Sequence, residues 1–307
     1  MNLSTKKGLS IWGGLLMSAT ASLHAASASE NGLTHYPVGV NTILPGILPA
    51  PGDTEFYSYT KYYNATSLKG SDGKSIDPSF DLTVAAEAFK LVHTWDQTVG
   101  PFSLSSSVIV PFTWVNINAF GRHDSSFGMG DPVISPVYLG YASPDHKFFS
   151  FIGLDIYAPL GSYNKDNLAN HGLNYWTFSP SINVTYMPTP QWEFSGTALL
   201  EFNTENPATN YRSGTDFIFD GAIGYYPMPE TVPKLKVSLQ GYALQQLSDD
   251  TQDGVSVGNR GSSFGVGPQI SYDIVPGGGL VLKYQRDFDV RNRAEGNSAW
   301  LQFAMPF

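Results

Sequence analysis

The chain has 307 residues, a formal net charge of −9, no cysteine and no long basic run. These properties exclude a disulfide framework, a thiolate metal centre and the electropositive footprint of a nucleic-acid-binding protein. Aromatic residues make up 14% of the chain, yet no stretch after Ala28 is apolar for long enough to form a membrane-spanning helix. The remaining choices are a large exported β protein and a membrane β-barrel.

The amino terminus has the pattern of a secretory signal peptide. Lys6 and Lys7 supply a positive start, Gly8–Leu23 is an apolar core, and Ala26–Ala28 is a small-x-small cleavage site. The apolar run is too short to cross a membrane as a helix. We therefore predict that residues 1–28 direct export and are removed by cleavage near residues 25–28.

Residues 29–53 precede the first strand pattern and fit no regular element. Prolines at 37, 45, 49 and 51 remove backbone donors and fix φ throughout this segment. Two interpretations stay open for this amino-terminal arm. It either lines or plugs the lumen of a barrel, or it is a periplasmic tether.

The rest of the chain alternates between apolar and polar residues with the period of two that is typical of strands. In the last segment, for example, Leu301, Phe303 and Met305 share one face. A soluble sandwich buries such a face, whereas a membrane barrel turns it toward lipid and keeps the polar face around a lumen. The predicted strands are Glu55–Thr66, Phe80–Trp95, Phe102–Val115, Asp131–Tyr141, Lys147–Tyr157, Tyr175–Met187, Gln191–Asn203, Thr215–Tyr226, Lys234–Gln246, Ser262–Ile274, Gly279–Val290 and Asn297–Phe307.

The lengths of the predicted strands and the alternation of short and long links favour a membrane barrel over a soluble β protein. Most predicted strands exceed the five or six residues usual in soluble proteins and match the roughly nine to eleven of a tilted membrane strand. Short links rich in Pro or Gly alternate with longer polar links such as Asn116–Gly130 and Leu247–Gly261, as periplasmic turns alternate with external loops. We predict an all-β fold over residues 54–307, a transmembrane antiparallel up-and-down β-barrel of about 12 strands.

Prolines interrupt three of the predicted strands, at Pro136, Pro180 and Pro268. Proline cannot donate to a β-ladder. We therefore expect a bulge or a locally opened ladder at each of them.

Several strings occur together in a familiar order. They are HYPVGVNTILPGILPAPG at His35–Gly52, GMGDP at Gly128–Pro132, APLGSY at Ala158–Tyr163, NYWTFSP at Asn174–Pro180, NPATNYRSG at Asn206–Gly214 and GYALQQLSDD at Gly241–Asp250. Over nearly the whole mature chain they resemble the phenol MetA-pathway family of outer-membrane proteins. The resemblance implies a barrel of the Gram-negative outer membrane linked to breakdown of aromatic or other hydrophobic compounds, as an uptake channel. It carries over no catalytic residue.

The function predicted is that of a channel for small hydrophobic solutes, aromatic ones included, and not that of an enzyme. The candidate lumen-lining residues lie on the polar faces of predicted strands, and they are Asp81, Glu87, Asp155, Glu193, Glu201, Asp220, Lys283, Gln285 and Asp287. Acids outnumber bases among them, which predicts a preference for cations or neutral solutes over anions. The expected partners are outer-membrane lipid and lipopolysaccharide, the small solute, and the barrel-assembly machinery, which would recognise the C-terminal strand ending at Phe307.

Two other classes of function stay open. His123 and Ser125 reproduce the His-x-Ser spacing of outer-membrane phospholipases, in which a base activates a nucleophile, but they lie in a polar link without a matching Asn. A structural or adhesive barrel would instead use its external loops to bind a partner. Asp249 begins a string like a calcium loop, but Arg260 stands where a bidentate Glu is needed. No metal or cofactor is expected.

Overall fold

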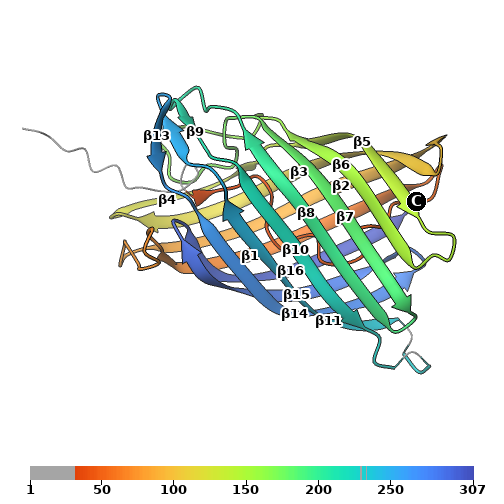
Figure 1. The fold of residues 1–307 in the computed structure, drawn as a ribbon. Helices are drawn as coiled ribbons and strands as arrows, with labels where there is room; N and C mark the ends of the chain where they lie inside the picture. The colour runs from red at the N-terminus through yellow and green to blue at the C-terminus, as the bar shows by residue number, and fades with distance from the viewer. Residues whose placement is uncertain (1–31, 229, 233) are drawn as a thin grey trace, which may run out of the picture.

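The computed structural model describes residues 32–228, 230–232 and 234–307, so the predicted signal peptide lies outside the described residues. The secondary-structure elements of these residues are β-strands (Figure 1). None of the described residues forms a helix long and apolar enough to cross a membrane. The strands are β1 Thr54–Leu68, β2 Asp81–Val99, β3 Phe102–Ala119, β4 Arg122–Met129, β5 Val133–Ala142, β6 Phe148–Tyr157, β7 Thr177–Thr189, β8 Trp192–Asn203, β9 Tyr211–Arg212, β10 Asp216–Tyr225, β11 Leu235–Gln246, β12 Asp250–Gln252, β13 Val255–Gly258, β14 Ser262–Val275, β15 Gly278–Arg291 and β16 Ala294–Pro306.

Twelve of these strands form one closed antiparallel barrel. Each pairs with the next along the chain, in the order β1, β2, β3, β5, β6, β7, β8, β10, β11, β14, β15 and β16, and β16 pairs back with β1. Closure leaves no sheet edge. A structure in hydrocarbon requires this, because lipid cannot form hydrogen bonds with free backbone groups. The predicted twelve-stranded up-and-down barrel is confirmed.

The outer face of the barrel is apolar and the inner face polar. Leu239 on β11 is 62% exposed, whereas the next residue, Gln240, is 2% exposed. This order is the reverse of that in a soluble protein and is the one expected of a barrel surrounded by lipid. Trp192 and Tyr225 add to an outer aromatic belt beside the short turns, with ring centroids 4.7 Å apart.

The prolines act on the ladders as expected. The pairing of β5 with β6 shifts register around Pro136. The β7–β8 ladder skips Pro180, and the β14–β15 ladder skips Pro268. A bulge and two opened ladders are therefore confirmed at these three positions.

Three of the longer links contain strands that the sequence did not reveal, and one of these strands is β9 in the link between β8 and β10. β3 continues to Ala119 and turns at Phe120 and Gly121, both with positive φ, into β4, which pairs only with β3. The link Leu247–Gly261 contains β12 and β13, which form a small separate sheet with β9. These pieces lie beyond the barrel wall, where water replaces lipid and no apolar face is required, so no alternation marks them.

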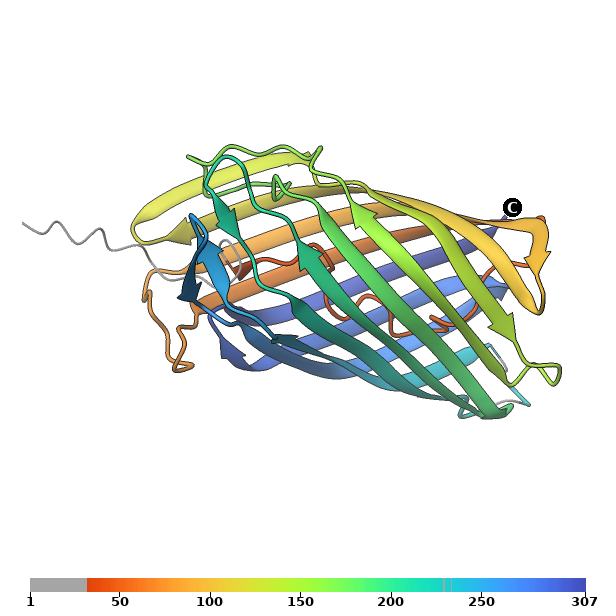
Figure 2. The ribbon, with the colours of Figure 1, turned by 45° about the horizontal axis from the view of Figure 1, so that its top comes forward.

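The segment 32–53 runs lengthwise inside the barrel (Figure 2). At the end with the longer links, which we take as external, the Arg293 guanidinium donates to the Thr34 hydroxyl (3.3 Å). At the opposite, periplasmic end the Gly52 N–H donates to the Thr94 carbonyl (2.8 Å), and β1 begins at once. The arm therefore threads the whole lumen before the first strand.

Candidate functional site

The arm has no regular secondary structure, so its backbone polar groups need partners from the barrel wall. Asp220 on β10 supplies three of them. Its carboxylate accepts hydrogen bonds from the backbone N–H of Gly39 (2.8 Å) and Asn41 (3.0 Å) and from the Tyr36 hydroxyl (2.7 Å). The Asp220 carboxylate is therefore bound to the arm and is not accessible to a solute.

Lys283 on β15 does the same for backbone carbonyls. Its ammonium group donates to the carbonyl oxygens of Gly39 (2.6 Å) and Val40 (2.9 Å) and to the Thr42 hydroxyl (3.0 Å). The side-chain amide of Gln302 on β16 also donates to Val40 (3.0 Å). All three donors of the buried ammonium are therefore used.

Two glutamates on β8 bind the arm on either side of the Asp220 contacts, one nearer the external end and one nearer the periplasmic end. Glu201 accepts from the Tyr36 N–H (2.7 Å), and Glu193 accepts from the Leu44 N–H (3.2 Å). Glu193 also forms a buried ion pair with Lys236 on β11. Arm and wall further share an apolar cluster of Tyr36, Val40, Leu199, Ile218, Leu244 and Trp300.

Seating of the arm depends on a glycine, which gives a first testable prediction. Gly39 has φ +79°, and a Cβ there would lie 2.1 Å from Nε2 of Gln285. We expect Gly39→Val to unseat the arm, because the side chain adds both backbone strain and a clash. Faster protease cleavage near residue 39 in detergent would show it. Gly254→Val is the control, since Gly254 has φ +76° in an external hairpin with nothing within 4 Å of its Cβ position.

Seven of the nine sequence-predicted residues face the interior. Asp287 accepts from the Tyr63 hydroxyl (2.9 Å), and Asp155 accepts from the Tyr138 hydroxyl (2.7 Å). Gln285 donates to the Gly39 carbonyl (3.2 Å). The structure thus gives most of these groups partners in the wall or the arm. The seven are Asp155, Glu193, Glu201, Asp220, Lys283, Gln285 and Asp287.

Asp81 and Glu87 do not face the lumen, and the prediction for these two residues is wrong in orientation. β2 keeps its register from Asp81 to Trp95, so Glu87 shares its face with Phe89, which is 43% exposed on the outside. The Glu87 carboxylate accepts from the hydroxyls of Ser58 (2.6 Å) and Thr60 (2.5 Å) on β1. The prediction assumed that every polar face points inward, and β2 reverses this rule.

The inner side of the middle of β1, β2 and β3 is a part of the wall to which residues 36–46 of the arm form no hydrogen bond, although Tyr59 packs against the apolar cluster of arm and wall. The hydrogen bonds of residues 36–46 to the wall go to β7, β8, β10, β14, β15 and β16. Inward residues of those strands are mostly buried, whereas those in the middle of β1–β3 are half-buried. We call this surface the uncovered face, and its residues are Tyr57, Tyr59, Lys61, Tyr63, Val84, Ala86, Ala88, Lys90, Ile109, Pro111, Thr113 and Val115.

The uncovered face was missed from the sequence because its side chains are mainly apolar or aromatic. The alternation of β2 could be read from its letters, but alternation alone does not say which side is the lumen. A useful signal was present in the pair Ala86 and Ala88, small residues that leave room inside. Lys90 between apolar neighbours was a second signal.

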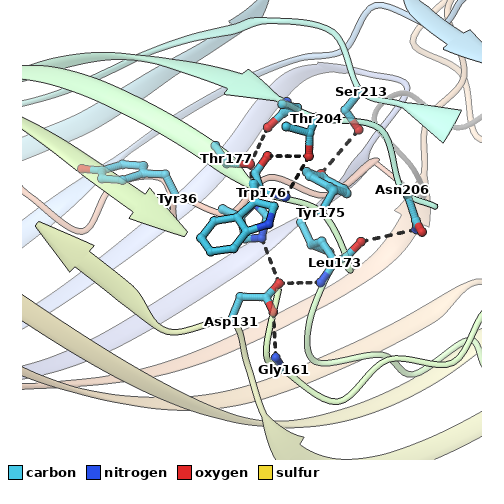
Figure 3. Close-up of polar contacts among 12 residues, drawn as sticks. Tyr36, Asp131, Gly161, Leu173, Tyr175, Trp176, Thr177, Thr204, Asn206 and Ser213 are labelled. Carbon is cyan, nitrogen blue, oxygen red and sulfur yellow. Dashed lines mark hydrogen bonds and ion pairs between the residues drawn. The ribbon is translucent and has the colours of Figure 1, made fainter. Parts of the chain in front are cut away.

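The external end of the arm is fastened to the β6–β7 link. The His35 ring contacts Asp131 through Nε2 (2.9 Å) and Thr177 through Nδ1 (2.7 Å). Asp131 also accepts from the backbone N–H groups of Gly161 (2.8 Å) and Leu173 (2.7 Å), as Figure 3 shows. One buried carboxylate therefore joins the arm to both ends of this link.

A second carboxylate, Asp124 on β4, holds the middle of the same link and gives a pH-dependent prediction. Hydrogen bonds from the N–H of Ala169 and, next, Leu168 lower the pKa of its carboxyl group below the ordinary value. A lowered pKa stabilises the attachment above the unfolded pKa of about 3.9, and this stabilisation is lost as the pH falls through the lower folded pKa. The protection factors of the amides at residues 164–170, that is, the intrinsic exchange rate at each pH divided by the measured rate, should therefore be larger at pH 5 than at pH 3.

The control for this prediction is Asp124→Asn. An amide does not titrate in this range. In this variant the amides of residues 164–170 should therefore have low protection factors at both pH values. Equal protection of the unmodified protein at pH 5 and pH 3 would contradict the assignment.

The phospholipase-like pair is not assembled. His123 and Ser125 pair with Asn118 and Asn116 on β3, and no hydrogen bond between the two is found in the described part of the chain. Ser126 contacts His171 instead (2.8 Å), but its hydroxyl donates to the Ala169 carbonyl (2.9 Å). The Ser126 hydroxyl therefore binds the β6–β7 link, and its proton is used in the hydrogen bond to Ala169.

The string that resembles the start of a calcium loop is closed by an ion pair. Asp249 contacts the Arg260 guanidinium at 2.6 Å and accepts from the Ser256 hydroxyl (2.8 Å). Over residues 32–228, 230–232 and 234–307, no three His, Asp or Glu side chains converge to hold a metal ion.

A closed barrel with an apolar outer face and a polar, threaded interior defines an outer-membrane β-barrel protein, which lies among outer-membrane lipid and lipopolysaccharide. The chain belongs to the family described as "Putative MetA-pathway of phenol degradation", whose model matches residues 65–303.

One solved outer-membrane channel shares the fold. The COG4313 outer membrane channel from Pseudomonas putida F1 is 17% identical with a TM-score of 0.76, and the alignment covers 87% of this chain and all of that one. The β domain of the Bordetella autotransporter BrkA is 12% identical with a TM-score of 0.47, covering 84% and 100%. The monoaromatic hydrocarbon channel CymD is 10% identical with a TM-score of 0.44, covering 84% and 88%. No curated protein matches the chain in sequence.

Proposed function

We propose that the protein is a passive channel that carries small hydrophobic solutes, aromatic ones among them, across the outer membrane. The observation that carries this proposal is the uncovered face. Its aliphatic and aromatic side chains are half-buried inside a barrel whose inner side is otherwise mainly polar and is hydrogen-bonded to the arm on six strands from β7 to β16. A porin for hydrophilic solutes has a polar lumen throughout, so an apolar strip suits a different solute.

The arm restricts the passage to the space beside the uncovered face. It occupies the side of the lumen formed by β7–β16 and is held by buried hydrogen bonds at Asp220, Lys283 and Glu193. A solute would pass between the arm and the uncovered face, in contact with both. The family description, which refers to phenol degradation, agrees with a solute that carries a ring.

Export and assembly complete the proposal. Residues 1–28 act as the signal peptide, with cleavage near residues 25–28. The barrel-assembly machinery binds the strand that ends at Phe307, whose side chain is 70% exposed at the periplasmic end. The chain performs no catalysis of its own in this proposal.

A side-chain substitution on β2 tests the route. Ala86 faces the lumen on the uncovered face, and Ala85 beside it faces lipid, opposite Tyr62 and Trp114. We expect Ala86→Trp to reduce uptake of a radiolabelled phenol several-fold in cells with an intact lipopolysaccharide layer. Ala85→Trp places the same ring in lipid and should leave uptake unchanged. Equal uptake by both variants and by cells that lack the protein would refute the proposal.

A further inference from the structure

We propose that the uncovered face selects aromatic anions, that is, rings bearing a carboxylate or phenolate, with Lys61 and Lys90 as the groups that bind the negative charge. This inference rests on the proposed channel function and narrows its solute class. It also reverses the preference for cations that the excess of acidic residues predicted.

The two lysines differ from the other basic residues of the barrel interior. Lys236 is paired with Glu193, and Lys283 is saturated by the arm. In the described chain, neither Lys61 nor Lys90 forms a hydrogen bond to protein or an ion pair within 4 Å. Both are half-buried on the inner side of the barrel and carry no ion pair, so we infer that their charges remain available to a solute.

Both ammonium groups lie against aromatic rings. Lys61 Nζ is 4.7 Å from the centroid of the Trp300 ring and 5.4 Å from that of Tyr63. Lys90 Nζ is 5.8 Å from the ring centroids of Tyr57 and Tyr138. Such contacts orient a cation without neutralising it. Each position therefore offers a positive charge for an acid group and ring surface for an arene.

The carboxylates of Asp220 and Asp287 interact electrostatically with Lys61 from beyond ion-pair distance, but their oxygens already accept hydrogen bonds from other groups. Asp220 is taken by the arm, and Asp287 accepts hydrogen bonds from Tyr63, Tyr242 and the Gly296 N–H. They lie on β10 and β15, and both side chains are buried. The acidic excess of the sequence therefore does not by itself decide which charge a solute meets.

Two carboxylates do lie on the same side as Lys90, and they limit where an anion would bind. Glu55 stands at the periplasmic end of β1, and Asp155 on β6 accepts from the hydroxyls of Ser135 (2.6 Å) and Tyr138 (2.7 Å). Both interact electrostatically with Lys90 from beyond ion-pair distance. Lys61 likewise interacts electrostatically with Asp287 and Asp220 from beyond ion-pair distance, so each lysine has two carboxylates at long range and no ion pair.

The register places the sites in sequence along the route. Lys61 pairs with Ala86, and Lys90 pairs with Tyr57, four residues nearer the periplasmic end of β1. At about 3.3 Å per residue the two rows are roughly 13 Å apart. An aromatic anion would meet Lys61 first from outside and then Lys90, with Ala88 and Tyr59 between them.

Ion selectivity in planar bilayers tests the inference on the full mature protein. In a KCl gradient the reversal potential should indicate chloride preference, and benzoate should block the chloride current more strongly than acetate. Lys61→Met with Lys90→Met keeps side-chain length and should lower the anion-to-cation permeability ratio by about tenfold. Lys74→Met is the control, because Lys74 is 84% exposed in the external β1–β2 link and paired with Asp72.

The outcomes separate this inference from the channel proposal. Cation preference in the unmodified protein, or an unchanged ratio in the double variant, would overturn the inference while the channel stands. Equal block by benzoate and acetate would remove the aromatic part of it. A protein that inserts but passes neither ions nor phenol would end the channel proposal and this inference together. Heat-dependent mobility of the variant on gels shows that it has folded.

Discussion

Replacing Asp220 with Ala and Lys283 with Met is expected to raise single-channel conductance several-fold. The first change leaves three donors of the arm without an acceptor, at Tyr36, Gly39 and Asn41. The second removes the ammonium donor of the Gly39 and Val40 carbonyls, which then keep only the side-chain amides of Gln285 and Gln302. Each polar group left unpaired inside the barrel costs about 1–3 kcal/mol, so the seated arm loses several kcal/mol relative to a displaced one.

Displacement matters because the arm occupies the polar half of the lumen. Once it leaves, the inner side of β7–β16 is hydrated and conducts ions. Planar-bilayer recordings measure the effect, and deletion of residues 33–47 sets its upper limit. Conductance of the double variant equal to that of the unmodified protein would mean that the arm does not restrict the passage. A value near that of the deletion would show that these two side chains hold the arm.

The strands were predictable because lipid imposes a simple rule on them. Each of the twelve predicted ranges overlaps one barrel strand, with ends that agree within about four residues. Outward residues such as Leu239 and Leu282 must be apolar, since nothing else suits hydrocarbon. The inner face is under a weaker constraint, because water, an arm or a solute can each cover it.

The candidate site was harder to predict for that reason. On β8 and β10 the polar inward residues were found, but their partner is the backbone of the arm, and no local pattern links Asp220 to Gly39 across 181 residues. On β2 the polar face of Glu87 points outward, where two hydroxyls satisfy it, while the apolar face points into the lumen. The error on β2 comes from equating polar with inward, and the omission on β8 and β10 comes from a partner that lies far away in the sequence.

The sign of the charge that a solute meets also depends on partners that lie far apart in the sequence. Most carboxylates counted from the sequence are used by Tyr36, Lys236 and backbone N–H groups. A solute meets only the charged groups that have no partner inside the protein. On the uncovered face these groups include the ammonium groups of Lys61 and Lys90. A charge count becomes a prediction about permeation only after the internal partners have been subtracted.

The second large effect is expected at the ion pair of Glu193 and Lys236. Both side chains are almost fully buried, at 3% and 1% exposure, so Lys236→Met leaves a carboxylate in the interior without its cation. Removal of one partner of a buried pair costs about 3–5 kcal/mol. The variant should therefore unfold at lower urea concentration, followed by tryptophan fluorescence in lipid vesicles. It should also loosen the arm at Leu44, whose N–H donates to the same carboxylate.

Two further variants decide what the loss means. Lys236→Met combined with Glu193→Gln removes both charges and keeps an amide oxygen that can accept from Leu44, so most of the stability should return. Lys234→Met is the matched control, because Lys234 is exposed and contacts only the Ile274 carbonyl (3.3 Å). If the single and the double variant were equally unstable, the aliphatic packing of Lys236 would be the cause rather than the unpaired carboxylate. If neither differed from the control, water must reach Glu193, and the seal between arm and wall would be looser than its hydrogen bonds imply.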